Sequence, residues 1–209
     1  RADDSGAGAP FVYNQMPQHP PLYYLAMASV LQVERALVGD APSLDREVGL
    51  LRFVNVAMLT PLPLLAWALA RRLGMDDRVG TVAALLPLAI PQLTHVGAAV
   101  NNDNLLVLLG ACLAVLLAGV ARGHRSPIVD VGVGAVVGLA LLTKGFAVMF
   151  LPIVVLAYVL CAWTRPRVRQ AAIRGGAVAT GVSVALGATW WIRNWIVEGE
   201  PAPTTENLT

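Results

Sequence analysis

Six apolar segments, each near the length of a membrane-spanning helix, are the feature that most constrains the fold of this chain. They cover residues 50–70, 80–100, 104–121, 127–143, 145–163 and 171–192. A hydrocarbon core about 30 Å thick takes roughly 20 helical residues to cross. The sequence therefore predicts an all-α polytopic membrane protein with about six transmembrane helices.

The composition agrees with this class. Charged residues make up 13% of the chain and hydrophobic residues 56%, whereas a soluble domain carries about 25% charged residues. The net charge is only +2, and the basic residues lie in loops, which argues against a nucleic-acid partner. Cys112 and Cys161 both lie inside apolar runs, which favours a role as small packing residues.

The apolar run 22–38 differs from the six spans. Proline fixes φ and lacks an N–H, so Pro20 and Pro21 end the preceding segment and can pre-organise the first turn of a helix. Glu34 and Arg35 interrupt the second half of the run. An amphipathic helix in the outer interface is therefore favoured over a seventh span.

Basic residues are distributed unevenly about the spans. If the span 50–70 runs inward, the opposite face holds only Lys144 and Arg193 beyond that span. Nine arginines fall on the other face: Arg71, Arg72, Arg78, Arg122, Arg125, Arg165, Arg167, Arg169 and Arg174. The positive-inside rule makes this second face cytoplasmic, so both termini are expected to face outward.

The expected organisation has three parts. Residues 1–49 form an outer loop that contains the interfacial helix 22–38, residues 50–192 form the transmembrane domain, and residues 193–209 begin a second outer loop. The chain starts and stops in loop-like sequence without an initiator Met or a signal segment, so we expect it to be part of a larger protein. The excess of arginine over lysine is typical of a GC-rich bacterial genome, and a bacterial plasma membrane is the expected location.

Lys144 is the sharpest single signal of function. It lies in a turn of about two residues, on the face that is otherwise poor in basic residues. A point charge that holds a lipid-linked phosphate would explain this position. The alternative is a snorkelling lysine that interacts with the dipole at a helix C-terminus, with Gly145 as the turn residue.

Further polar residues come from several loops on the predicted outer face. With Lys144, the candidates for substrate binding are His19, Tyr23, Asn101, Asn102, Asp103 and Arg193. One helix cap needs only one polar residue, so the Asn101–Asp103 run has more polar side chains than a cap requires, and the others can bind a substrate. Arg193 suits bidentate phosphate contact or an interfacial anchor, and His19 suits acid–base work or a local hydrogen bond.

Paired carboxylates occur in the outer segments only at Asp3 and Asp4. One of them can serve as a general base, and a solvated terminal loop is the alternative interpretation. Asp103 with neighbouring amides is a poor match to the usual metal ligand sets. We therefore predict no metal site and no cofactor, and a divalent metal stays open as an alternative.

Five motifs resemble, in order, landmarks of the GT-C superfamily of membrane glycosyltransferases. They are "QHPPLYYL", "LLRFVNVAM" leading to "ARRL", "LLPLAIPQLTHVGAAVNNDNLL", "LALLTKGFAVMFLP" and "WWIRNWIVEGEP". Within the superfamily, the chain is most similar to the protein mannosyltransferase and aminoarabinose transferase group and to an allied bacterial membrane family of unknown function. The resemblance runs across nearly the whole chain.

The resemblance implies a function. An outer cavity would bind a polyprenyl-phosphate sugar and pass the sugar to an acceptor glycan, lipid or protein, with an acidic residue of the first outer loop as base. Asp3 and Asp4 lie in that loop without matching the family's acidic position, so the base is unknown, and we expect this part of the protein to be inactive alone. The competing class is a transporter or structural subunit, for which Pro61, Pro63, Pro87, Pro91 and Pro152 would supply discontinuous helices.

Overall fold

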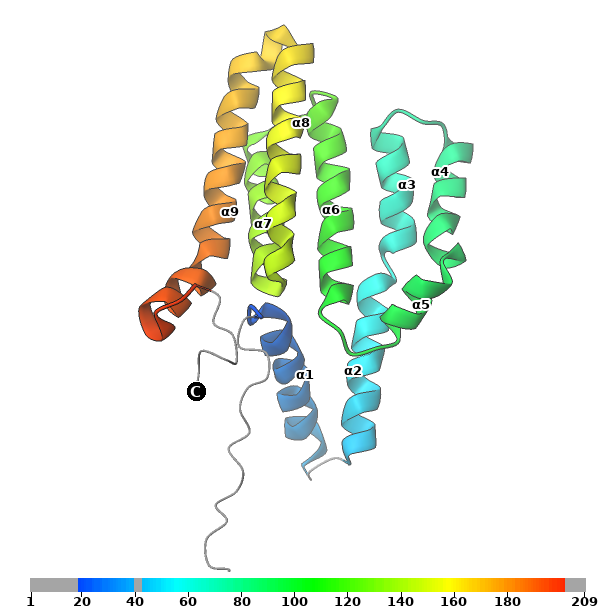
Figure 1. The fold of residues 1–209 in the computed structure, drawn as a ribbon. Coiled ribbons are helices and arrows are strands. Elements are labelled where there is room, and N and C mark those ends of the chain that lie inside the picture. The colour runs from blue at the N-terminus through cyan, green and yellow to red at the C-terminus, as the bar shows by residue number, and fades with distance from the viewer. Residues whose placement is uncertain (1–18, 40–42, 202–209) are drawn as a thin grey trace, which may run out of the picture.

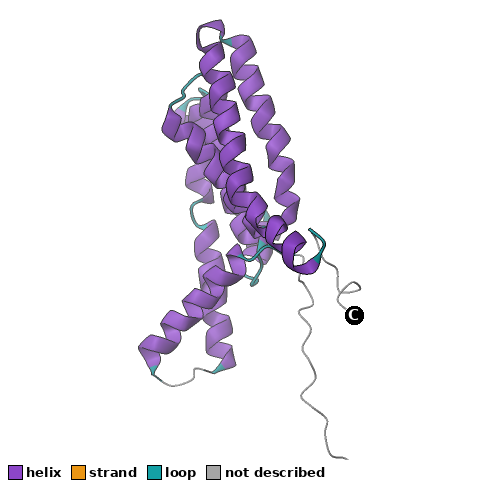
Figure 2. Ribbon diagram, turned by 90° about the vertical axis from the view of Figure 1, so that its left-hand side faces the viewer, coloured by secondary structure: helices purple, strands orange, loops and turns teal. Residues whose placement is uncertain are grey.

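The computed structural model describes residues 19–39 and 43–201, and within them the chain is helical without any strand (Figures 1 and 2). The α-helices are α1 (Leu22–Val38), α2 (Leu44–Leu59), α3 (Leu62–Arg72), α4 (Asp77–Leu85), α5 (Pro91–Gly97), α6 (Asp103–Ala121), α7 (Pro127–Thr143), α8 (Phe150–Thr164) and α9 (Arg169–Glu198). Short 3-10 helices form η1 (Leu86–Ala89), η2 (Gly145–Met149) and η3 (Pro166–Val168).

Four helical runs of the described chain are long and apolar enough to cross a membrane. They are Leu44–Arg72, Asp103–Ala121, Gly145–Thr164 and Pro166–Glu198. A fifth span forms if Asp77–Ala89 and Pro91–Gly97 count as one element bent by 60°, and α7 is a shorter apolar helix of 17 residues. The predicted fold class, an all-α polytopic membrane protein, is confirmed, and each of the six predicted segments falls on one of these elements.

Prolines lie where each of the first two spans passes from one helix to the next, and only the second span is sharply bent. Pro61 follows the last turn of α2, and Pro91 is the first residue of α5. Proline has no N–H to continue a helical ladder and pushes its predecessor towards extended backbone. Ile90, directly before Pro91, has φ −97° and ψ 102°. The first span also begins at Leu44 rather than at residue 50, because the polar turn with Asp45 and Glu47 is helical as well.

The core of the bundle lies among α6, α7, α8 and α9. Val120, Val133, Val137, Val154 and Cys161 are fully buried there. Glycines let α7 and α9 approach closely: a Cβ on Gly138 would come within 2.6 Å of the Leu186 Cβ. Membrane helices commonly associate through such small residues, because lipid supplies no hydrophobic driving force between them.

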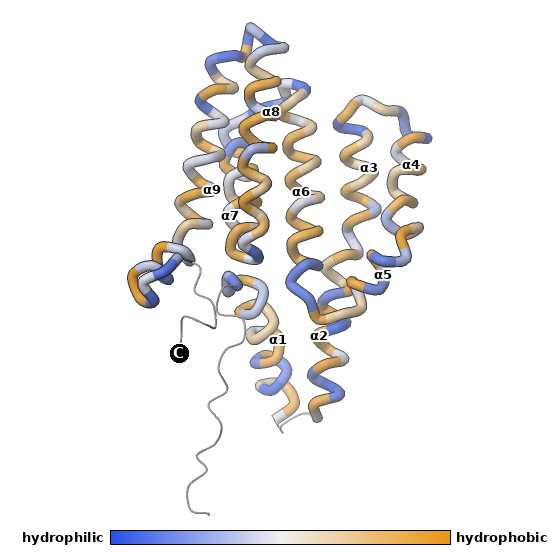
Figure 3. The backbone as a smooth tube through the Cα atoms, in the orientation of Figure 1, coloured by the Kyte–Doolittle hydropathy of each residue, from blue (hydrophilic) through white to orange (hydrophobic). Residues whose placement is uncertain are grey.

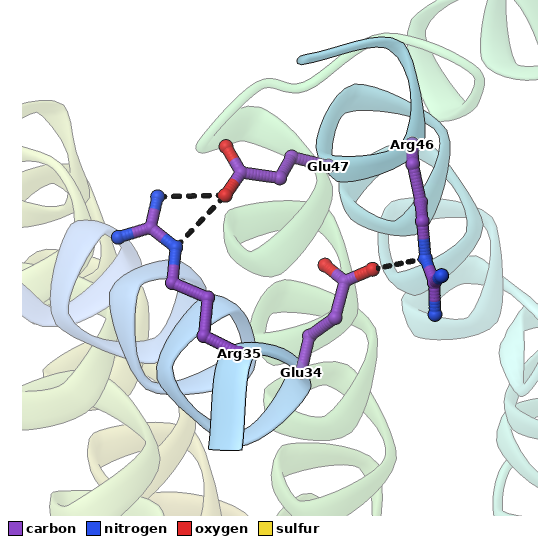
Figure 4. Close-up of polar contacts among 4 residues, drawn as sticks. All are labelled: Glu34, Arg35, Arg46 and Glu47. Carbon is purple, nitrogen blue, oxygen red and sulfur yellow. Dashed lines mark hydrogen bonds and ion pairs between the residues drawn. The ribbon is translucent and has the colours of Figure 1, made fainter. Parts of the chain in front are cut away.

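Helix α1 is not one of the spans. It lies beyond the end of α7 and runs obliquely beside the first half of α2, as both views show (Figures 1 and 2). Two ion pairs join α1 to α2: Glu34 with Arg46 at 2.8 Å and Arg35 with Glu47 at 2.7 Å (Figure 4). The charges that interrupt the apolar run therefore face α2, and the position of α1 in a membrane interface stays a prediction.

The two ends of the bundle differ in their polar residues (Figure 3). The connections from α3 to α4, from α6 to α7 and from α8 to α9 lie together at one end, at the top of Figure 1. The nine arginines lie in these connections and in the adjoining turns of the helices. The segment before α6 and the end of α7 lie at the other end, next to the start of α1. We call the first the arginine-rich end and the second the α1 end.

Candidate functional site

A cavity of about 530 Å³ opens at the α1 end, between α1, the segment before α6 and the end of α7. Its lining residues are His19, Tyr23, Tyr24, Met27, Ala28, Leu31, Leu51, Val100, Asn101, Asn102 and Lys144. Figure 3 shows hydrophilic segments of the three elements close together here. Five of the seven predicted substrate-binding residues thus line one cavity, although they are spread over about 125 positions of the sequence.

Lys144 is held at this cavity by the end of α7 and by an ion pair. The helix stops at Thr143, and Lys144 has extended backbone with φ −156° and ψ 133°. Its Nζ lies 2.6 Å from Oδ1 of Asp103, the first residue of α6. An ammonium group has three donors, so the contact with Asp103 leaves two N–H groups for a ligand.

Asn101 shapes the turn that positions Asp103 at the start of α6. The Asp103 backbone N–H donates to the Asn101 Oδ1 at 3.0 Å, and the Asn101 Nδ2 donates to the Asp103 Oδ2 at 3.3 Å. Such a side-chain turn is a usual way to start a helix. Local structure therefore explains the contact between Asn101 and Asp103, and the side chains of Asn101 and Asn102 also line the cavity.

Tyr23 belongs to a buried amide network that sequence analysis missed. Its hydroxyl donates to the Asn55 Oδ1 at 3.0 Å, and the Asn104 Nδ2 donates to the same oxygen at 2.8 Å. Both asparagines are fully buried. Burial raises the pKa of the Tyr23 hydroxyl above its ordinary value of 10.0, so the group keeps its proton as a donor. A single amide inside the apolar run "FVNVAML" was the available signal.

Tyr23 therefore ties α1 to α2 and, through Asn55, to α6, and it lines the cavity. The Asn55 Nδ2 donates to the Leu51 carbonyl at 2.8 Å, and the Asn104 Nδ2 also reaches the Ala99 carbonyl at 3.0 Å. Through Asn104, which bonds both Ala99 and Asn55, the segment before α6 is linked to α2. The network sets the spacing between the α1 wall of the cavity and the wall that carries Asp103.

Arg193 is not brought to this cavity. Its guanidinium lies 5.3 Å from the centre of the Trp190 ring, donates to the Asn194 Oδ1 at 3.0 Å and lies 3.4 Å from the Glu198 carboxylate. These neighbours are those of an aromatic anchor near the end of a helix. A contact between Arg193 and the substrate stays a prediction.

Asp3 and Asp4 lie outside the described residues, so their role as catalytic base also stays a prediction. Among residues 19–39 and 43–201, no group of three His, Cys, Asp or Glu side chains is placed to hold a metal ion. Among the described residues, no carboxylate lines the cavity, and the carboxylate of Asp103 is paired with the lining residue Lys144. What this part of the cavity offers is a cation and amide donors, a set suited to an anionic group.

A second polar cluster, also missed from the sequence, lies at the arginine-rich end. The Asp130 carboxylate is paired with Arg125 and accepts a hydrogen bond from the Tyr158 hydroxyl at 2.6 Å. The Arg125 guanidinium also lies 5.4 Å from the centre of the Tyr158 ring. An acidic residue inside the apolar run "SPIVDVGVG" was the signal. The cluster joins α7 to α8 and is remote from the candidate cavity.

The apolar helices and the polar cavity at one end define a multi-pass membrane protein. A sequence model of the dolichyl-phosphate-mannose-protein mannosyltransferase family matches residues 18–191. The chain belongs to this family, and its predicted membership of the GT-C superfamily of glycosyltransferases is confirmed. Comparison with curated proteins and with solved structures gave no significant match. The matched region includes every lining residue of the cavity and ends before Arg193.

Proposed function

We propose that this chain transfers a sugar from a polyprenyl-phosphate donor to an acceptor glycan, lipid or protein at the outer face of a bacterial plasma membrane. The donor phosphate binds in the cavity at the α1 end, beside Lys144. The observation that supports this proposal most directly is that Lys144 lines the same cavity as His19, Tyr23 and Asn101. The Asp103 carboxylate holds the Lys144 ammonium group in place there. Family membership supports the reaction class.

The reaction requires two contributions from the protein: positive charge near the leaving phosphate and correct positioning of the acceptor. The bond between the sugar C1 and the phosphate oxygen breaks with its electron pair on the phosphate, and the acceptor hydroxyl oxygen forms the new bond to C1 from the opposite side. Configuration at C1 is thereby inverted. Lys144 stabilises the charge that accumulates on the leaving phosphate. The acceptor proton passes to a carboxylate, for which Asp3 and Asp4 are the candidates.

The alternative of a transporter has less support. One discontinuous span is present among the described residues, the bent pair Asp77–Ala89 and Pro91–Gly97, and α2 passes into α3 at Thr60 and Pro61. The cavity of about 470 Å³ between these breaks, however, has only Thr60 and Thr94 as polar lining residues. A path for a polar solute needs more hydrogen-bonding groups at that depth.

Turnover of a polyprenyl-phosphate sugar by the purified complete protein tests the proposal. Lys144→Ala removes a charge-assisted contact that contributes roughly 1.5 to 3 kcal/mol, so donor use should fall about tenfold to a hundredfold. Lys144→Arg should keep part of the activity, because the charge persists while its geometry changes. Both partners of the Asp103 pair are partly exposed, so stability should change by less than about 1 kcal/mol.

Arg52→Ala is the matched control, because it removes an exposed cation of α2 that does not line the cavity. Its turnover should equal that of the wild type. Arg193→Ala tests separately whether the second predicted cation takes part. Wild-type turnover in Lys144→Ala, with an unchanged melting temperature, would leave Lys144 as an anchor and remove the residue-level support for this site.

A further inference from the structure

Three arginines converge on a small cavity at the arginine-rich end. The cavity has a volume of about 370 Å³ and is lined by Arg122, Gly123, Arg165, Pro166, Arg167 and Val168. None of the three guanidinium groups forms an ion pair with a carboxylate of the part of the chain that the structure describes. Three like charges held together repel one another, so a bound anion would stabilise this arrangement.

Backbone contacts fix two of these guanidinium groups. The Arg122 Nη1 donates to the Leu73 carbonyl at 3.1 Å, and the Arg165 Nε donates to the Ala121 carbonyl at 3.4 Å. Gly123 has φ +83°, and a Cβ there would come within 2.9 Å of the Arg165 Cδ. Each guanidinium has five N–H donors, so most of them stay available. Capping of helix C-termini explains where Arg122 and Arg165 lie, but it does not explain why Arg167 joins them.

An apolar groove runs away from this cavity along α8 and α9. It has a volume of about 710 Å³, and its walls include Val155, Val159 and Ala162 of α8 and Ile173 and Ala177 of α9. From Val155 to Trp163 it follows α8 for about 12 Å, at 1.5 Å per residue. Pro166 lines both the groove and the arginine cavity, so the two spaces are adjacent. Trp163 and Arg169 line the groove at this same end.

We propose that this end of the bundle binds one anionic phospholipid, with the phosphate among Arg122, Arg165 and Arg167 and an acyl chain in the groove between α8 and α9. Charge complementarity selects an anionic head group, and the adjoining apolar groove selects a lipid over a free anion. The arginine-rich end is also the one predicted to face the cytoplasmic leaflet, where anionic lipids bind basic pockets between helices. The site lies at the opposite end of the bundle from the proposed donor cavity and is independent of it.

Native mass spectrometry of the purified complete protein, titrated with phosphatidylglycerol or phosphatidylcholine, tests the proposal. Phosphatidylglycerol should bind more tightly. A basic residue near an anionic membrane surface contributes about fivefold in affinity, and we expect a contribution of this size from each arginine that contacts the bound head group. Combined Arg122→Gln, Arg165→Gln and Arg167→Gln should therefore weaken phosphatidylglycerol about a hundredfold and leave phosphatidylcholine unchanged. Arg167→Gln alone, which removes no hydrogen bond that the structure describes, should cost about fivefold and serves if the triple variant does not fold.

Two further variants separate this site from general attraction to a basic surface. Arg78→Gln removes an exposed cation of α4 at the same end but outside the cavity, and it should bind phosphatidylglycerol like the wild type. Ala177→Phe fills the groove from an exposed position, so it should weaken phosphatidylglycerol without affecting glycerol phosphate. Equal losses from Arg78→Gln and Arg167→Gln would overturn the proposal. So would inorganic phosphate or glycerol phosphate binding as tightly as the lipid, which would indicate an anion site without a lipid.

Discussion

Among single residues, Asn55 joins helices that are distant in the sequence. Its side-chain oxygen accepts hydrogen bonds from Tyr23 and Asn104, and its amide group donates to the Leu51 carbonyl. The side chains of Tyr23, Asn55 and Asn104 are buried, and an unsatisfied buried donor costs about 1 to 3 kcal/mol. One buried side chain thus connects α1, α2 and α6 beside the candidate cavity.

Asn55→Leu should therefore destabilise the protein, because it leaves the Tyr23 hydroxyl and the Asn104 amide without their shared acceptor. We expect a loss of about 1 to 3 kcal/mol, or a melting temperature lower by roughly 2 to 10 °C, measured by thermal unfolding in detergent. Tyr23→Phe, which removes one donor and keeps the acceptor, should cost less than half as much. Equal melting temperatures for Asn55→Leu and the wild type would contradict a structural role for the network.

The positions of Lys144 and Asp103 could be predicted from the sequence, but their contact could not. The position of Lys144 on a face poor in basic residues was visible in the sequence, as was the polar run before α6. Their ion pair was not, because the two residues are 41 positions apart and nothing local specifies which spans are neighbours. A list of polar residues on one face predicts a candidate site without its internal contacts.

Among the helices, α7 and α9 form the closest pair of the bundle, and glycines make this possible. A Cβ on Gly134 would meet the Val182 Cβ at 2.7 Å, and one on Gly138 would meet the Leu186 Cβ at 2.6 Å. The two glycines are four residues apart, so they lie on one face of α7. They follow the small-xxx-small pattern of tightly packed membrane helices.

Gly138→Ala should force α7 and α9 apart and destabilise the bundle by about 1 to 3 kcal/mol, the usual range for overpacking. Gly132→Ala in the same helix is the matched control, since apart from the neighbouring backbone of α7 itself no atom lies within 4 Å of the added Cβ. Alanine is favoured over glycine in a helix by about 1 kcal/mol, so the control should be neutral or stabilising. Thermal unfolding of the two variants measures the difference, and equal stability would refute the close-packing interpretation.

Sequence patterns predicted the helices better than their interruptions and contacts. Hydropathy located all six segments because a membrane imposes a length on each. The polar first turn of α2 was assigned to a loop, because Asp45 and Glu47 lower the hydropathy although they suit a helix N-terminus. The ion pairs from α1 to α2 were also missed, since Glu34 and Arg35 were judged only by what they do to an apolar run.

For the bundle as a whole, the structure separates two polar ends by an apolar middle (Figure 3). One end combines Lys144 with amides in a cavity beside α1, and the other gathers arginines beside a lipid-sized groove. The proposed donor site and the proposed phospholipid site both bind an anionic group, yet they lie at opposite ends of the bundle. The direction in which the chain is inserted therefore decides which leaflet supplies each ligand.

Single-cysteine labelling tests this direction. Positive-inside bias predicts that the arginine-rich end is cytoplasmic and the α1 end faces outward. In a background with Cys112→Ala and Cys161→Ala, a cysteine at the exposed Ser43 before α2 should react with a membrane-impermeant maleimide in intact cells. A cysteine at the exposed His124, in the turn from α6 to α7, should react only after permeabilisation. The reverse pattern would place the Lys144 cavity on the cytoplasmic face, where its donor would have to come from the cytoplasmic leaflet. The proposal of a transferase with an outward-facing site would then be wrong.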